Sequence, residues 1–278
     1  MNPRFRPLLI LARLLLVLAL LLVCCQHKLI YFPRPYSPAM PAAFLKQGGI
    51  KIEARTGQGR QVAWLAKPVG GKPAAHLWIV CGGNGTLALE LEDVMRDLPA
   101  MGDAVLYFDY PGYGECEGAS TPGRLRDSLK ALVPLAADAC GIKREELATR
   151  GIVFGHSLGA SVALIAAGEF GMKRAVLLSA FTSSMDMASR VIGLPLGFLV
   201  THRFDNVKAM QGMIARDGKI WLLHGADDEI IPIAMGRKLS VVAPQSTTYT
   251  ELPGVGHNDI FDVAPHAVSA AIFAAREN

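Results

Sequence analysis

A serine set between two glycines is the residue in this sequence best suited to nucleophilic chemistry. Gly155-His156-Ser157-Leu158-Gly159 follows a short apolar run, 151–154, and precedes a helix-forming run, 160–167. A strand, a tight turn and a helix in that order expose a serine hydroxyl, and the glycines permit the close backbone approach that the turn requires. We therefore predict that Ser157 is a nucleophile, with the Leu158 amide and the positive helix end beside a developing oxyanion.

A serine hydroxyl is a weak nucleophile, so such a site also needs a base and an acid that orients the base. His257 is the favoured base because it lies in a glycine-containing loop after the last expected strand, whereas the other histidines lack that context. The turn after the expected strand 219–224 contains both Asp227 and Asp228. Either carboxylate could orient the base, and the alternative role for either is capping the helix that follows Pro232.

A glycine-rich loop, Cys81-Gly82-Gly83-Asn84-Gly85-Thr86, follows another apolar run. Glycines let the backbone approach a ligand, and enzymes with a serine on a strand-to-helix turn take a second oxyanion donor from the loop at this place. The amide of Asn84 or of Gly85 is the predicted donor. Asp109 to Gly114, after the next apolar run, is predicted to be a turn that supports the pocket.

The elements that must position these residues alternate along the chain. Apolar runs that can be buried on both faces are typical of parallel strands covered by helices, and ligands bind at the carboxyl ends of such strands. An opening antiparallel hairpin precedes them. The sequence thus predicts an α/β fold with strands over 50–56, 61–66, 76–81, 104–110, 151–154, 175–179, 219–224 and 247–252, and helices over 87–100, 124–140, 158–170, 234–242 and 264–276.

Composition limits the possible classes. Hydrophobic residues make up 51% of the 278 residues, which is ample for one large buried core. Seven basic residues precede the first acidic residue, Glu53, and the rest of the chain is slightly acidic, so a nucleic-acid partner is not expected. The five cysteines form no CxxC pair or zinc-type cluster, so neither a metal nor another cofactor is predicted.

The N-terminus resembles an export or anchoring segment. Residues 1–13 contain three arginines, Leu14 to Val23 is an uninterrupted apolar run, and Cys24 and Cys25 follow. Residues 1–26 are therefore predicted to be a signal anchor, with a lipoprotein signal or a cleaved signal as alternatives. Each version puts the catalytic part on the extracytoplasmic, periplasmic side of a membrane. Residues 27–40 are predicted to be a linker, and residues 41–278 the catalytic domain.

A segment of about 40 residues, around 181–217, separates two expected strands at the position of a lid. Its apolar character suits either a surface for acyl chains or an ordinary packed helix. Gly193, Pro195 and Gly197 would permit movement in both cases. The apolar residues of the segment are Met185, Met187, Val191, Ile192, Leu194, Leu196, Phe198, Leu199 and Val200.

Taken together, these motifs resemble the short-lid α/β-hydrolases, a group that includes bud-emergence-type hydrolases and protein depalmitoylases. The similarity spans roughly residues 40–275, and many bacterial relatives carry a membrane segment followed by a stretch similar to Leu29 to Pro33. A departure is Gly82, where relatives often have histidine. The motifs that carry the resemblance are Gly82 to Gly85, Asp109 to Gly114, Gly155 to Gly159, Phe181 to Ser183, His224 to Asp228 and Gly256 to Asp259.

The resemblance implies an α/β-hydrolase fold with a mostly parallel eight-stranded sheet, helices on both faces and a small lid. It assigns the acid to Asp228, which completes a triad with Ser157 and His257, and it implies ester, thioester or related acyl hydrolysis without a cofactor. The expected substrate is a small-molecule or lipid acyl compound, and the expected state is a monomer. A peptidase or amidase with the same triad, or a non-catalytic binding protein on this fold, is the alternative.

Overall fold

The computed structural model of the chain describes residues 25–193 and 197–278, together with residues 13, 17 and 23. The membrane segment predicted over residues 1–26 lies almost entirely outside the described part of the chain. Among the residues that are described, no helix has both the length and the apolar character needed to cross a bilayer.

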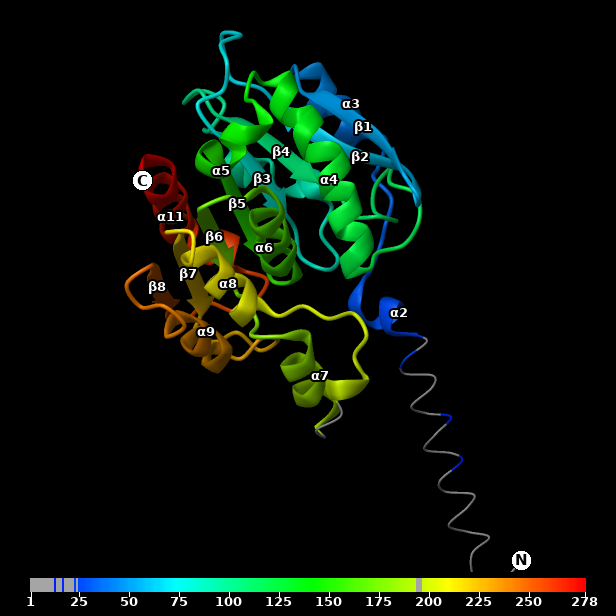
Figure 1. The fold of residues 1–278 in the computed structure, drawn as a ribbon, viewed down its shortest axis with the longest axis vertical. Coiled ribbons are helices and arrows are strands. Elements are labelled where there is room, and N and C mark those ends of the chain that lie inside the picture. Colours follow the sequence, from blue (N-terminus) through cyan, green and yellow to red (C-terminus); the bar gives the residue numbers. More distant parts are fainter. Residues whose placement is uncertain (1–12, 14–16, 18–22, 24, 194–196) are drawn as a thin grey trace, which may run out of the picture.

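One sheet of eight strands forms the centre of the described chain (Figure 1). Its spatial order is β1-β2-β4-β3-β5-β6-β7-β8. The pairs β1–β2 and β2–β4 are antiparallel, and every other pair of neighbouring strands is parallel. This arrangement confirms the predicted mostly parallel sheet. The strands are β1 Ile50–Thr56, β2 Gly59–Ala66, β3 Leu77–Cys81, β4 Ala104–Phe108, β5 Gly151–His156, β6 Arg174–Leu178, β7 Lys219–Gly225 and β8 Thr247–Leu252.

Helices cover both faces of the sheet. One face packs against α4, α6 and α8, which lie over it in Figure 1, and the other packs against α3 and α11. Strands β3, β4, β5 and β6 are buried at every residue because helices cover both of their faces. The helices are α2 Gln26–Ile30, α3 Ala39–Lys46, α4 Pro122–Ala139, α5 Leu147–Arg150, α6 Leu158–Phe170, α7 Ser184–Ile192, α8 Asn206–Ile214, α9 Ile233–Ser240, α10 Ile260–Val263 and α11 Pro265–Glu277.

The last strand differs from the buried interior run that its sequence predicted. Along β8, partly buried residues alternate with exposed ones, because the strand lies at the edge of the sheet and pairs only with β7. Thr248 and Thr250 are exposed, whereas Thr247, Tyr249 and Glu251 on the opposite face are partly buried, which is ordinary for an edge strand.

The helix predicted over residues 87–100 does not form. Two short 3₁₀ turns, η2 Ala88–Leu91 and η3 Asp93–Met95, take its place. The amide of Ala88 donates to Asp109 Oδ1 at 2.9 Å, and the amide of Leu89 donates to the Tyr36 hydroxyl at 3.1 Å. The start of the segment is thus bound to the turn after β4 and to Tyr36.

Residues 27–40 were predicted to be a linker, but part of this segment packs against the domain. Tyr31 is only 3% exposed and belongs to the hydrophobic core. The Tyr36 hydroxyl donates to Asp109 Oδ2 at 2.7 Å, and α3 begins at Ala39, before the expected domain start at residue 41. Tyr31 and Tyr36 therefore pack into the fold.

Candidate functional site

Three of the predicted site residues meet at the carboxyl ends of the parallel strands. The Ser157 Oγ lies 3.0 Å from His257 Nε2, and His257 Nδ1 lies 2.7 Å from Asp228 Oδ2. Ser157 follows β5, Asp228 follows β7 and His257 follows β8. Asp227, the other acid considered, is exposed and stands outside this chain of hydrogen bonds. A serine, an imidazole and a carboxylate in this order can carry out nucleophilic acyl transfer.

The turn that presents Ser157 is strained and tightly packed. Ser157 has φ 57° and ψ −120°, a conformation that residues with a side chain rarely adopt. A β-carbon on Gly159 would lie 2.1 Å from the carbonyl oxygen of Cys81, and one on Gly155 would lie 2.2 Å from the carbonyl oxygen of Gly159. The glycines of the motif are therefore required by contact between backbone segments.

Gly159→Ala is expected to lower the free energy of unfolding by about 3 kcal/mol, because β3 and α6 would have to move apart. Urea denaturation followed by circular dichroism measures this loss. Gly168→Ala in the same helix is the matched control, since a β-carbon there meets nothing within 4 Å. The control should be neutral or slightly stabilising, and equal losses in the two variants would contradict the packing explanation.

Asp228 is held by more groups than the sequence indicated. Its Oδ1 accepts from the amides of Ile230 and Ile231 at 3.0 and 2.7 Å, and its Oδ2 lies 3.4 Å from His224 Nε2. Burial acts to raise the pKa of Asp228, but the hydrogen bonds from His224, His257 and the Ile231 amide together hold that pKa well below its usual range. The carboxylate is therefore ionised and can stabilise an imidazolium at His257.

His156 supports the loop that carries His257. Its Nε2 lies 3.0 Å from the His257 carbonyl oxygen, and since a carbonyl only accepts, Nε2 carries the hydrogen. Burial, with the neighbouring His257, lowers the pKa of His156 to about 4. The sequence placed His156 within the serine turn without assigning it this contact.

The titration of His156 predicts a pH dependence of stability. A histidine with a lowered pKa in the folded state binds more protons when unfolded, so its contribution is lost as pH falls below about 6.5 toward 4. Between about pH 7 and pH 5, this loss amounts to about 2 kcal/mol. His156→Gln has no histidine to titrate at this position. Between pH 7 and pH 5, its free energy of unfolding should therefore rise by that amount relative to the wild type. Urea midpoints at both pH values measure this change, and an unchanged difference between the two proteins would contradict it.

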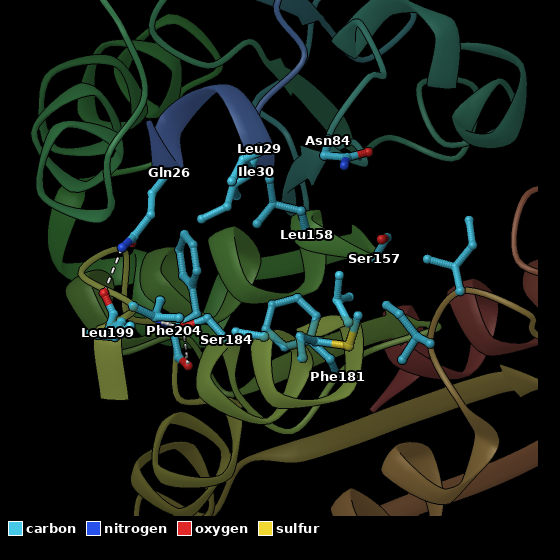
Figure 2. A pocket seen from close by; sticks show the side chains of 16 residues that line it. Gln26, Leu29, Ile30, Asn84, Ser157, Leu158, Phe181, Ser184, Leu199 and Phe204 are labelled. Atoms are coloured by element: carbon cyan, nitrogen blue, oxygen red, sulfur yellow. Dashed lines mark hydrogen bonds between the residues drawn. The ribbon is translucent and has the colours of Figure 1, made fainter. Parts of the chain in front are cut away.

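Two of the three predicted oxyanion residues lie at the cavity next to Ser157. Asn84 and Leu158 line it (Figure 2), and among the described residues neither of their amides has an acceptor. Gly85 does not line the cavity, and its carbonyl accepts from Arg34 Nε at 2.7 Å. The amides of Asn84 and Leu158 are therefore the pair available to a developing oxyanion.

The turn from Asp109 to Gly114 supports this loop, as predicted. The hydroxyl of Tyr110 donates to the carbonyl of Gly82, and that of Tyr113 donates to the carbonyl of Asn84. These two hydrogen bonds hold the backbone of the glycine-rich loop in place, so its conformation does not depend on a bound ligand.

A cavity of about 370 Å³ opens at Ser157 and is lined mainly by apolar side chains (Figure 2). Helix α7 forms one wall with Met187 and Val191, and the following segment adds Leu199 and Val200. Helix α8 packs instead against the sheet, so the lid segment contains both an apolar cover and an ordinary packed helix. Leu194 and Leu196, also predicted to be apolar lid residues, lie outside the described residues, and Phe198 is exposed.

Metal ligands do not gather at the site. Within the described ranges, no group of three or more histidine, cysteine, aspartate or glutamate side chains could hold a metal ion. The chemistry available to these residues is that of the serine, the histidine and the carboxylate.

Comparisons with known proteins agree with this fold. The model of the alpha/beta hydrolase family matches residues 79–217. The uncharacterized protein Rv2307c of Mycobacterium tuberculosis is 28% identical over 235 residues, covering 84% of this chain and 81% of that protein. The esterase Pf2001 of Pyrococcus furiosus superposes with a TM-score of 0.67 at 17% identity, covering 89% of this chain and 97% of the esterase. Esterase RhEst1 of a Rhodococcus species superposes with a TM-score of 0.57 at 16% identity, over 81% of this chain and 98% of that one.

Proposed function

Since the chain belongs to the alpha/beta hydrolase family, we propose that it is a serine hydrolase that cleaves an ester, thioester or related acyl bond through Ser157, His257 and Asp228. The observation that carries this proposal is the continuous line of hydrogen bonds from Asp228 through His257 to the Ser157 Oγ, at the edge of an apolar cavity. A nucleophile beside a cavity with few polar groups suits an acyl chain better than a charged substrate.

In the proposed mechanism, His257 Nε2 takes the proton of the Ser157 hydroxyl as Oγ attacks the acyl carbon. The resulting oxyanion accepts hydrogen bonds from the amides of Asn84 and Leu158, and Asp228 stabilises the imidazolium. His257 then protonates the leaving alcohol or thiol, which departs and leaves an acyl-enzyme. Water, deprotonated by His257, attacks the acyl carbon and regenerates Ser157 with release of a carboxylic acid.

The proposed substrate is a small-molecule or lipid acyl compound, and the proposed location is a membrane on its extracytoplasmic side. The basic and apolar pattern of residues 1–26 supports a signal anchor or lipoprotein signal. A membrane-held enzyme with an apolar acyl cavity would meet lipid substrates at high local concentration. The monomeric state and the absence of a nucleic-acid partner remain part of the proposal.

A comparison of esters with amides tests the proposed bond class. The full chain in detergent should hydrolyse a p-nitrophenyl ester at least about 100-fold faster than the p-nitroanilide of the same acyl group, because p-nitrophenoxide is a better leaving group than the anion of p-nitroaniline. Comparable rates would favour the peptidase or amidase alternative. Failure of a fluorophosphonate to label the protein, with no turnover of either compound, would favour a non-catalytic binding protein.

A further inference from the structure

The N-terminal segment forms part of the cavity beside Ser157. Leu29 and Ile30 of α2 line it together with residues of α7 and of the segment after α7. Figure 2 shows the two side chains on the same side of the cavity as Asn84, with Phe181 and Ser184 across from them. A segment that the sequence assigned to a linker therefore supplies one wall of the site.

Gln26 fixes this wall to the segment after α7. Its Nε2 donates to the Leu199 carbonyl at 2.7 Å, and its Oε1 accepts from the Thr201 amide at 2.7 Å and the Thr201 hydroxyl at 3.0 Å. Gln26 is 6% exposed, so a lost bond would leave a buried polar group unpaired. Tyr31 adds a contact, since its hydroxyl lies 3.4 Å from His202 Nδ1.

The other end of the segment is bound to the loop that carries the candidate oxyanion donor. The amide of Phe32 donates to the carbonyl of Asn84 at 2.9 Å. Arg34 Nε donates to the carbonyl of Gly85, and its Nη2 pairs with Glu90. Residues 26–34, here named the strap, thus connect the two loops that border the cavity.

We propose that the strap determines which acyl chains the site accepts, with Leu29 and Ile30 contacting the chain and Gln26 positioning the opposite wall. This inference deepens the proposed function and rests on it. Leu29 is 59% exposed, whereas Ile30 is half-buried against the core, so Ile30 is the better-fixed contact. A protein that began at residue 41 would keep Ser157, His257 and Asp228 but lack this wall.

The test compares p-nitrophenyl acetate with p-nitrophenyl octanoate in the full chain. Ile30→Trp should fill the cavity and lower the ratio of kcat/KM for the octanoate to kcat/KM for the acetate about tenfold or more. Leu45→Trp, on the exposed side of α3, is the control and should leave the ratio unchanged. A proportional loss for both esters, or no change in either, would overturn the proposal.

Gln26→Ala tests the positioning role. Its KM for the octanoate should rise about tenfold because the segment from Leu199 to His202 loses four hydrogen bonds, and this rise should exceed the change in kcat for either ester. An equal fall of kcat for both esters would indicate a merely structural role and would contradict the proposal.

Binding separates this inference from the proposed function. Calorimetry measures the affinity of the Ser157→Ala protein for decanoic acid, with and without Ile30→Trp. It therefore reports the effect of the strap on acyl-chain binding in the absence of turnover. At least tenfold weaker binding with Ile30→Trp supports the strap even where no ester is hydrolysed. Equal affinities would show that the strap does not determine acyl-chain binding. That result would overturn this inference even if the wild type hydrolyses esters as the proposed function requires.

Discussion

Ser157→Ala is expected to lower kcat for ester hydrolysis by a factor on the order of 10⁵, because the variant has no nucleophile to form the acyl-enzyme. The fold should be unaffected. Alanine fits where the serine hydroxyl contacts only His257, so any change in stability should come from the loss of that contact and stay within about 1 kcal/mol. Initial rates with a p-nitrophenyl ester, together with a thermal melt, measure both quantities.

Ser161→Ala is the matched control for this variant. Ser161 lies in the same helix, α6, and its buried hydroxyl has no hydrogen-bond partner among the described residues. Its replacement should leave kcat within about twofold, since the hydroxyl lies outside the line from Ser157 to Asp228. Ester turnover and fluorophosphonate labelling that survive in Ser157→Ala would show that another residue is the nucleophile.

The sheet could be predicted from the sequence because its signals are local. Runs such as 104–110 and 219–224 are apolar, short and bounded by polar or glycine-containing turns, and each forms a strand that ends within two residues of the expected position. The spacing of Gly155, Ser157 and Gly159 is equally local. Since parallel strands end at one edge of the sheet, these patterns also indicated where Ser157, Asp228 and His257 would meet.

The strap could not be predicted because its contacts join distant parts of the chain. Gln26 binds Leu199 and Thr201, and a glutamine next to an apolar leader gives no local sign of such partners. The segment after Leu87 was misjudged for the same reason, since its amides bind Asp109 and Tyr36 in place of a helical ladder. In both cases tertiary hydrogen bonds overrode the local pattern.

His224 shows an intermediate case. The sequence placed it at the end of a strand, which is correct, but gave no reason to expect a contact with Asp228. In the structure, His224 Nε2 lies 2.8 Å from the carbonyl of Ile231 and 3.4 Å from Asp228 Oδ2. A histidine four residues before an acid in a strand-to-turn segment is the signal that could have revealed this pairing.

Asp228→Asn is expected to lower kcat by a factor of about 10⁴ at neutral pH, with little change in KM. The carboxylate oxygen accepts the hydrogen of His257 Nδ1, which leaves Nε2 free to take the proton of Ser157. An amide nitrogen in that place would donate to Nδ1, so the imidazole would carry its hydrogen on Nε2 and could not act as the base. Steady-state kinetics with a short-chain ester measure the effect.

Asp227→Asn provides the comparison that makes the Asp228 variant informative. The two acids are adjacent, but Asp227 is exposed and makes no side-chain bond to His257. Its amide donates to the carbonyl of Val255, a bond that the substitution keeps. Activity within about twofold of wild type is therefore expected for Asp227→Asn. The reverse ranking of the two variants would assign the orienting acid to Asp227, and the loop between β7 and α9 would then have to rearrange when substrate binds.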